Sequence, residues 1–318
     1  MRKLFVVLNI LIISLLASCT SEPKVDYMPI FALETQIDVT FYNVDNSDVH
    51  FKEIKKIYNN VNRVASDFES NSKKNSVYDL NLNREIEADS LLVDMVKEAL
   101  VLKEETNGYF NPFIGRLSHL WKDSINNTKV PLSDEVIESE LAIMNNTSLT
   151  IDGNKLSLNG DGNLDLGGMA KGYATELCKK YLDSAGVTRY IIDAGHSNII
   201  FGDKMKEDFK VGLSSPIDNK IVSVVKGQNL AIGTSSFEHQ SFIHDGNRYH
   251  HLISPFTGKP SNYYDSVSVI MDDSTRCDVY STALYGMDQE SIEKLNIRVI
   301  LIKDNKVIYT NCGDLIGK

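Results

Sequence analysis

The chain has 318 residues, of which 42% are hydrophobic and 24% charged, so it has ample apolar material for a globular core. Its formal net charge is −10, and no cluster of Lys and Arg interrupts this acidic balance. Since nucleic acids and anionic lipids bind to basic surfaces, the charge argues against nonspecific binding to either, and we expect no nucleic-acid partner.

The amino-terminal residues have the pattern of a bacterial export signal. Arg2 and Lys3 precede an apolar run over residues 4–17, which is short for a membrane span. The run ends in residues 16–19 (LASC), and small residues before a cysteine resemble the lipobox of bacterial lipoproteins, in which that cysteine is lipidated. A simple signal peptide and an uncleaved anchor are the alternatives.

The lipobox interpretation divides the chain into three parts. We expect a lipoprotein signal peptide over residues 1–18, a polar tether over 19–30 that begins at lipidated Cys19, and a globular domain over 31–318. Two or more acyl chains would hold the protein stably at a membrane. The protein is therefore expected to be exported, lipid-anchored to a bacterial membrane and facing the periplasm.

The order of predicted elements indicates the fold class. Apolar residues at helical spacing predict helices over residues 48–66, 89–107, 169–183 and 277–287. Alternating or short apolar runs predict strands over residues 35–42, 148–158, 190–194, 199–202, 209–213, 221–225, 266–271, 297–302 and 306–310. Residues 122–135 are predicted to be a polar connection. Because strands outnumber helices and follow one another closely, we expect an α+β fold rather than a doubly wound sheet.

The sharpest motif is a glycine turn at the start of a predicted helix. Asp165 and Leu166 precede Gly167 and Gly168, and Lys171 follows one turn later. A helix N-terminus offers free N–H groups and a positive dipole end, which suit a phosphate, and glycines let the backbone approach a ligand closely. The pattern is neither of the common nucleotide-binding glycine motifs, so a plain turn into a helix remains the alternative.

A second candidate combines a carboxylate and a hydroxyl. Asp278 and Thr282 are four residues apart on a predicted helix and so share one face. They offer hard oxygen ligands of the kind that Mg²⁺ binds. The alternative is an Asp that caps the helix N-terminus and a Thr that merely faces the helix surface.

Two adjacent histidines, His250 and His251, point to opposite faces if they lie on a strand, so only one can face a pocket. Their spacing matches no common zinc motif, whereas a general base is a natural role for one of them. The remaining cysteines and the single tryptophan are predicted to be core residues: Cys178, Cys277, Cys312 and Trp121.

These motifs together resemble the ApbE family of FAD:protein FMN transferases, from about residue 31 to 315. Residues 165–173 (DLGGMAKGY) are similar to the family's D-L-G-G-I-A-K-G-Y, and residues 108–113 (GYFNPF) to its G-A-F-D-P-T. Residues 234–237 (TSSF) occupy the position of A-T-S-G-D-Y. Residues 251–258 (HLISPFTG) resemble H-I-I-D-P-R-T-G, and 278–283 (DVYSTA) resemble the end of A-D-A-L-A-T-A. Five motifs in the family's order make the resemblance specific.

The resemblance implies a fold, an activity and a set of site residues. The fold is α+β, T-fold-like, with a mostly antiparallel sheet. The activity is Mg²⁺-dependent transfer of FMN from FAD to a threonine hydroxyl, with release of AMP. The Mg²⁺ ligands are the carbonyl of Gly168 and the side chains of Asp278 and Thr282, and His251 is the matched base. The implied FAD contacts are Phe68, Tyr109, Phe110, Asn111, Asp165, Lys171, Leu252 and Ser281.

The implied partner is an acceptor protein of a membrane electron-transport complex that carries a short Thr-containing motif. FAD hydrolysis to FMN and AMP, a non-catalytic flavin-binding lipoprotein and an interaction lipoprotein with a decayed site are the alternatives. Several positions depart from the family's pattern: Asn111, His196, Ser254 and Phe256. We expect these departures to affect ligand affinity more than fold, and we expect His196 to be a packed loop residue rather than a site group.

Overall fold

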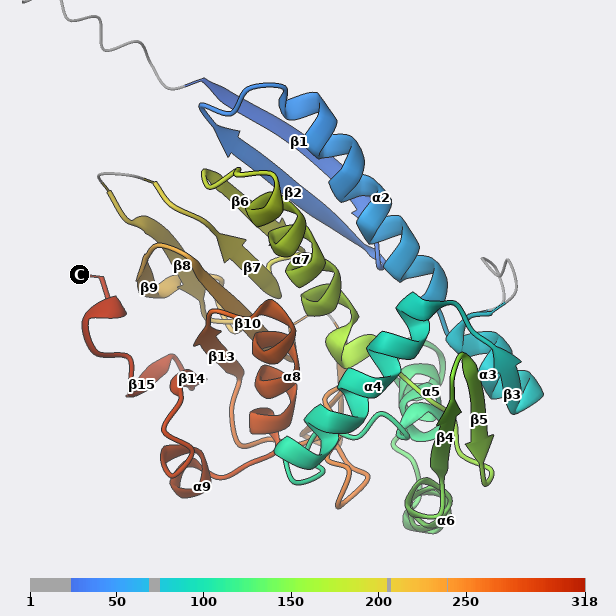
Figure 1. The fold of residues 1–318 in the computed structure, drawn as a ribbon. Coiled ribbons are helices and arrows are strands. Elements are labelled where there is room, and N and C mark those ends of the chain that lie inside the picture. Colours follow the sequence, from blue (N-terminus) through green and yellow to red (C-terminus); the bar gives the residue numbers. More distant parts are fainter. Residues whose placement is uncertain (1–23, 69–74, 205–206, 239, 318) are drawn as a thin grey trace, which may run out of the picture.

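The computed structural model describes residues 24–68, 75–204, 207–238 and 240–317. The predicted signal peptide, Cys19 and the first part of the predicted tether lie outside these residues. One antiparallel sheet of eight strands forms the centre of the protein (Figure 1). Its strands, in spatial order, are β1 (Val25–Ala32), β2 (Thr35–Tyr42), β6 (Tyr190–Ala194), β7 (Asn198–Phe201), β10 (Leu230–Ser236), β13 (Ser266–Met271), β14 (Arg298–Lys303) and β15 (Lys306–Thr310).

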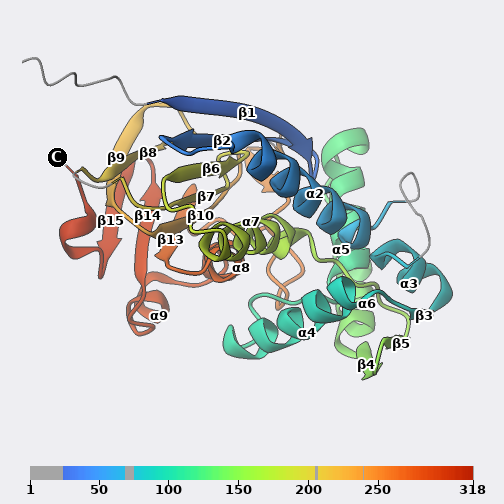
Figure 2. The same ribbon diagram turned by 45° about the horizontal axis from the view of Figure 1, so that its top comes forward.

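Helices cover one face of this sheet, where α7 (Gly167–Ser184) lies between α2 (Ser47–Ala65) and α8 (Ser274–Tyr285) (Figure 2). A hairpin of β8 (Phe209–Ser214) and β9 (Ile221–Gly227) packs on the other face. The strands alternate accordingly: on β10, Ala231 joins the helix-side core and Ile232 the hairpin-side core. This period-two alternation is what a sheet buried on both faces requires.

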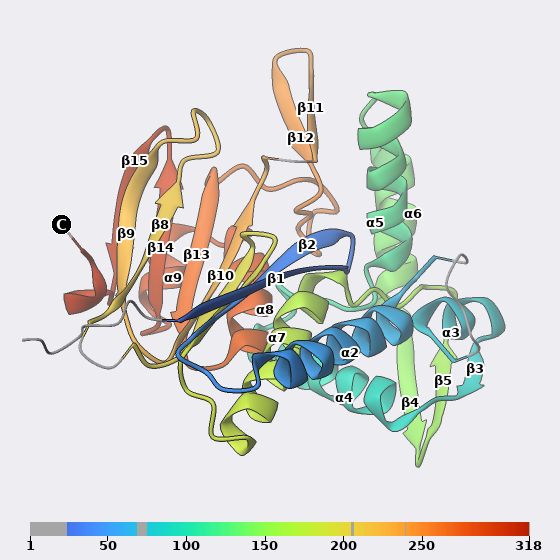
Figure 3. The same cartoon turned by 90° about the horizontal axis from the view of Figure 1, so that it is seen from above.

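A helical region adjoins the sheet. It contains α3 (Val77–Asn83), α4 (Ser90–Glu105), α5 (Gly115–Asp123), the short π-helix η2 (Ser124–Thr128), α6 (Asp134–Asn145) and a small sheet in the order β3 (Glu85–Glu87), β5 (Lys155–Asn159), β4 (Ser148–Asp152). The hairpin of β11 (Ser241–His244) and β12 (Asn247–His250) stands beside α5 and α6 (Figure 3). Its Tyr249 stacks on Trp121 at 5.8 Å between ring centroids. The chain closes with α9 (Gln289–Glu293) and the 3₁₀ turn η3 (Gly313–Leu315).

Most predicted elements are confirmed, with identifiable physical causes. Helix α2 buries Ile54, Tyr58, Val61 and Val64, which recur at helical spacing. Helix α4 begins at an N-cap, Asp89, whose side chain accepts a hydrogen bond from the N–H of Leu92. The predicted core residues are also confirmed, since they are at most 3% exposed: Cys178, Cys277, Cys312 and Trp121.

Three predictions about elements were wrong. The polar tether predicted for residues 19–30 ends too late, because β1 begins at Val25 and pairs with β2 along its whole length. Residues 122–135 are not a simple connection, since they contain the end of α5, η2 and the start of α6. The central strand β10 was missed, because its small polar residues do not form an apolar run. Within the described ranges, no helix has both the length and the apolar character that a bilayer span needs.

Candidate active site

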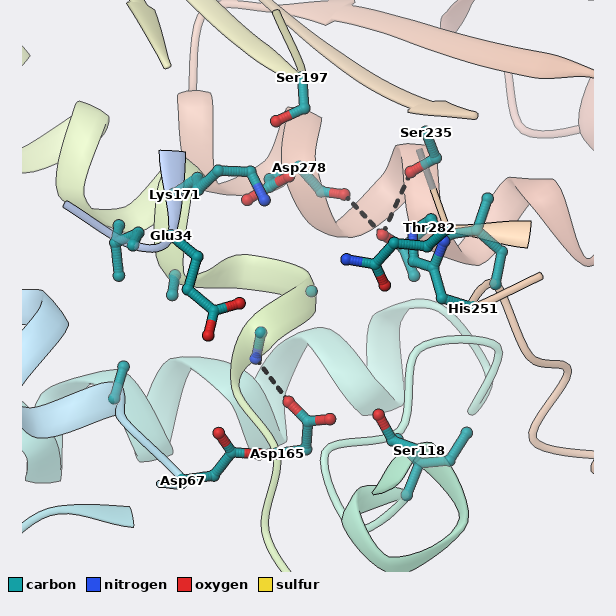
Figure 4. Close-up of a pocket in the computed structure, with 18 of the residues that line it drawn as sticks. Glu34, Asp67, Ser118, Asp165, Lys171, Ser197, Ser235, His251, Asp278 and Thr282 are labelled. Carbon is teal, nitrogen blue, oxygen red and sulfur yellow. Dashed lines mark hydrogen bonds between the residues drawn. The ribbon is translucent and has the colours of Figure 1, made fainter. Parts of the chain in front are cut away.

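A cavity of about 680 Å³ lies where α7, α8, α5, β10 and the turn between β1 and β2 meet (Figure 4). Its volume is within the range of pockets that bind small molecules and cofactors. Most of the site residues predicted from the sequence line it: Phe68, Tyr109, Phe110, Asn111, Asp165, Gly168, Lys171, His251, Leu252, Asp278 and Thr282. The structure thus brings together residues that are more than 200 positions apart in the chain.

The glycine turn forms one wall of the cavity. Helix α7 begins at Gly167 without a side-chain cap from Leu166, and the carboxylate of Asp165 accepts a hydrogen bond from the N–H of Gly167 at 2.7 Å. Gly168 faces α8, and an added Cβ would lie in ordinary contact, 3.7 Å from the hydroxyl oxygen of Thr282. The backbone of this turn is therefore open to a ligand and adjacent to the second predicted motif.

Asp278 is not a helix cap. Helix α8 begins at Ser274, earlier than predicted, and its N-cap is Asp273, which accepts a hydrogen bond from the N–H of Arg276 at 2.9 Å. Asp278 lies inside the helix, is 5% exposed, and accepts a hydrogen bond from the N–H of Gly172 at 2.8 Å. Burial raises the pKa of its carboxyl group, while the charge of Lys171 and the bond from Gly172 act in the opposite direction.

Hydroxyl groups bond to the backbone carbonyl of Asp278 and to one another. Thr282 lines the cavity and donates to the backbone carbonyl of Asp278 at 3.3 Å, and Ser235 of β10 lies 3.4 Å from the Thr282 hydroxyl (Figure 4). Ser281, in contrast, is fully buried and is not among the lining residues. It donates to the carbonyl of Asp278 and lies 2.9 Å from Ser235, so it supports the wall from behind instead of contacting a ligand directly.

The two histidines diverge as expected. His250, the last residue of β12, is fully buried, its Nε2 lies 2.9 Å from the carbonyl of Ser261, and its Nδ1 accepts from the N–H of Leu252. Burial lowers the pKa of His250 to about 4, so the ring is neutral near pH 7. His251 follows directly and lines the cavity near Thr282 and Ser235 (Figure 4).

Another wall contains residues that the sequence did not single out. His119 of α5 lies 2.5 Å from the carboxylate of Asp67, stacks on Phe68 and lines the cavity together with both. Lys122 of α5 and Glu34 of the turn between β1 and β2 complete this wall. No sequence signal pointed to these four polar residues, because they come from three separate segments and form no local motif.

The off-pattern positions have different locations. Asn111 lines the cavity and accepts from the N–H of Phe113 at 3.1 Å. Ser254 accepts two backbone N–H groups of its own turn, and Phe256 is 56% exposed and packs against Tyr109; neither is among the residues lining the main cavity. The expectation that His196 is packed was wrong. Its side chain is 83% exposed, its Nδ1 lies 2.7 Å from a carboxylate oxygen of Asp193, and its backbone has a positive φ of 58°.

The donor set suits a hard cation better than a soft one. Among the described residues, no group of three or more His, Cys, Asp and Glu side chains is arranged to hold a metal ion. The predicted set has one carboxylate, one hydroxyl and one backbone carbonyl, which are oxygen ligands of the kind that Mg²⁺ takes alongside water or phosphate oxygens. Four carboxylates and two lysines contribute to the cavity lining: Glu34, Asp67, Asp165, Asp278, Lys122 and Lys171. This excess of carboxylates would attract a cation into the cavity.

Comparisons with known proteins agree with this geometry. The sequence profile of the ApbE family matches residues 33–300. An FAD:protein FMN transferase of Vibrio cholerae is 28% identical over 245 residues, which cover 75% of this chain and 73% of the relative. The ApbE protein of Thermotoga maritima has the same fold, with a TM-score of 0.81 at 23% identity over 92% of this chain and 99% of that one. The flavin transferase ApbE of Vibrio cholerae superposes with a TM-score of 0.76 at 25% identity over the same shares. These solved structures confirm the predicted α+β class, and the chain belongs to the ApbE family of enzymes.

Proposed function

We propose that this enzyme transfers FMN from FAD to a threonine hydroxyl of an acceptor protein and releases AMP. The observation that carries the proposal is the convergence of the glycine turn, Asp278, Thr282 and His251 on one cavity. Each comes from a motif that resembles the ApbE pattern, and relatives named FAD:protein FMN transferase align over most of the chain. The cavity volume of about 680 Å³ supports a ligand as large as a dinucleotide.

We further infer that the reaction depends on Mg²⁺. The carbonyl of Gly168 and the side chains of Asp278 and Thr282 would hold the ion, and a shared site is supported because a Cβ added at Gly168 would lie 3.7 Å from the Thr282 hydroxyl. When bound, Mg²⁺ would neutralise charge on the pyrophosphate and on the departing AMP. Lys171 follows Gly168 in the first turns of α7 and would add a positive charge beside the phosphates.

The positions of the cavity residues indicate what each would do in the transfer. The acceptor's threonine oxygen forms a bond to the phosphorus of the FMN half, and the bond from that phosphorus to the oxygen of AMP breaks. His251 takes the proton from the threonine hydroxyl, which is a role suited to an imidazole near neutral pH. Tyr109, Phe110 and Leu252 line the cavity and would supply apolar surface to the bound FAD. Positioning and charge compensation, more than covalent help from the protein, lower the barrier of such a transfer.

The cellular setting is part of the same proposal. Lipidation at Cys19 would hold the enzyme at a bacterial membrane, facing the periplasm. An acceptor belonging to a membrane electron-transport complex would present its threonine in that compartment. The lipobox-like residues 16–19 are the observation that motivates this placement.

The test uses residues 20–318 mixed with FAD, Mg²⁺ and a candidate acceptor. A fluorescent acceptor band on a denaturing gel, abolished by EDTA and accompanied by AMP, is the expected result. Metal-dependent production of FMN and AMP with acceptors of several sequences, but never a labelled band, would replace transfer by hydrolysis. A protein that binds FAD without turning it over would refute the catalytic proposal.

A further inference from the structure

The cavity wall opposite Asp278 contains a cluster of interacting side chains, here called the ring cluster: Glu34, Asp67, Phe68, His119 and Lys122. All five line the cavity. They come from the turn between β1 and β2, the segment after α2, and α5. None of the polar members was singled out by a sequence motif, and the proposed chemistry does not use them.

Phe68 is the centre of the ring cluster. Its ring is stacked with the imidazole of His119, with centroids 5.8 Å apart and planes 20° from parallel. The amino group of Lys122 lies 4.2 Å from the centroid of the same ring, which is within cation–π distance. Phe68 is still 40% exposed, so part of this aromatic surface remains open to the cavity.

His119 and Lys122 are themselves held in place. The Nε2 of His119 lies 2.5 Å from a carboxylate oxygen of Asp67, the residue before Phe68. Lys122 forms an ion pair with Glu34 at 3.6 Å, which connects α5 to the turn between β1 and β2. The N–H of Phe68 donates to the hydroxyl of Ser66 at 3.3 Å. The ring of Phe68 is thus fixed through its neighbours and through its own backbone.

We propose that His119 is a positioning residue that, anchored by Asp67, holds Phe68 flat against one heteroaromatic ring of the bound dinucleotide. The proposal rests on the proposed FAD-dependent function. A planar aromatic surface that is held in advance binds a planar ring more tightly, because less side-chain entropy is lost on binding. Both the flavin and the adenine are planar heteroaromatic rings, and either can occupy this surface.

The same geometry predicts a pH dependence of binding. The hydrogen bond to Asp67 is the main reason that the pKa of His119 is raised, the charge of Asp165 also raises it, and Lys122 and burial oppose it. Glu34 faces Lys122 on the far side of the ring cluster. Because the imidazolium binds Asp67 more strongly than the neutral ring does, we expect FAD affinity to fall as the pH rises through this raised pKa.

The test measures FAD affinity by flavin fluorescence with Mg²⁺ and without acceptor protein, so that no FMN is transferred, from about pH 6, below the ordinary imidazole pKa, up to about pH 9. His119→Gln should weaken FAD binding about fivefold to tenfold at the lower pH and remove the pH dependence. Asp67→Asn, which changes no volume, should shift the pH transition downward. In the transfer assay, KM for FAD should rise about as much while kcat changes less than about threefold.

His196→Gln is the matched control. His196 also bonds an aspartate, Asp193, at 2.7 Å, but its side chain is exposed and is not among the cavity-lining residues, so affinity and pH profile should not change. Titrations with FMN and with AMP identify the ring, since His119→Gln should weaken only the one that lies on Phe68. If His119→Gln fails to fold, the pH dependence of FAD affinity in Asp67→Asn tests the same positioning role.

The outcomes separate this inference from the proposed function. Wild-type protein that binds FAD, with His119→Gln and Asp67→Asn equal to it in affinity and pH profile, overturns the positioning role. Wild-type protein that binds no FAD refutes the proposed function, and the positioning role with it.

Discussion

Replacing Asp278 by Asn separates the chemistry of this residue from its packing. Asparagine has nearly the same shape, and its side-chain oxygen can still accept the hydrogen bond that Gly172 donates at 2.8 Å. The change therefore removes one negative charge and leaves the contact between α7 and α8 in place. Because the carboxylate is only 5% exposed, metal-free protein should lose no more than about 1 kcal/mol of folding stability, and can gain stability.

The pH dependence of folding stability predicts the direction in which Asp278→Asn differs from the wild type. The folded pKa of Asp278 is raised by burial, so the folded state binds more protons than the unfolded state between the unfolded and the folded pKa. The contribution of the Asp278 carboxyl group to folding stability is fully present below the pKa that this group has in the unfolded chain. It is lost as the pH rises through the pKa that the group has in the folded protein. In EDTA, thermal denaturation should show that Asp278→Asn gains on the wild type as the pH rises across this window.

The same substitution, Asp278→Asn, should lower the transfer activity even where it leaves stability unchanged or raises it. Losing the only carboxylate of the proposed Mg²⁺ site should lower FMN transfer by about 100-fold to 1000-fold, the scale of removing one preorganised electrostatic group. Mg²⁺ should raise the melting temperature of the wild type and leave that of Asp278→Asn unchanged. The control is Asp272→Asn, an exposed carboxylate just before α8, which should alter neither quantity.

Two results would refute the reasoning about Asp278. One is wild-type transfer activity in Asp278→Asn at limiting Mg²⁺, because the carboxylate would then have no role in holding the ion. The other is a loss of melting temperature in EDTA as large as that of a core truncation, about 2 kcal/mol or more, because the residue would then be mainly structural.

Three further changes test the helix contact and the two histidines. Gly172→Ala would place a Cβ 2.5 Å from both the Cβ of Asp278 and the carbonyl of Ser274, so calorimetry should show a loss of about 1–3 kcal/mol; unchanged stability would contradict the close contact. His251→Ala should slow transfer at least about 100-fold while FAD affinity, read by fluorescence, stays within about twofold; an equal loss of both would indicate a binding role. The folded pKa of His250, about 4, lies below the unfolded value, so its contribution to stability is complete above about pH 6.5 and is lost as the pH falls toward 4. His250→Asn should therefore reduce the acid-induced loss of stability, by at most about 3 kcal/mol, in denaturant titrations across this range.

The sequence was sufficient to predict elements whose residues repeat with a clear period. Helices α2, α4 and α7 and strands such as β6 and β15 were found because their buried residues recur at helical or alternating spacing. Helix α6 was missed because one of its buried positions is Glu140, which Arg116 pairs through two hydrogen bonds of 2.8 Å. An ion pair across two helices adds no apolar signal at the two positions that form it.

The parts of the candidate site that lie within one short sequence motif were predictable. Two motifs are of this kind, the glycine turn and the pair Asp278 and Thr282. Each spans only a few residues of the chain, and both line the cavity. Ser281 matched a motif equally well, yet it faces the interior, because a helix places neighbouring residues about 100° apart. The polar members of the ring cluster could not be predicted, since Asp67 follows α2, His119 lies on α5, and the two meet only in the folded chain.

We expect the departures from the family's pattern to leave the proposed metal site intact, because of where α8 is held. Glycines lie on two sides of it: an added Cβ at Gly172 would lie 2.5 Å from Asp278, and one at Gly233 would lie 2.2 Å from the carbonyl of Cys277. Any larger residue there would move the helix that carries the carboxylate. Ser254 is buried within its own turn, Phe256 lies on the surface, and neither lines the main cavity, so substitutions at those positions change what surrounds the cavity and not the distance between α7 and α8. Close packing at two glycines, more than identity at the rim, is therefore what the proposed site requires.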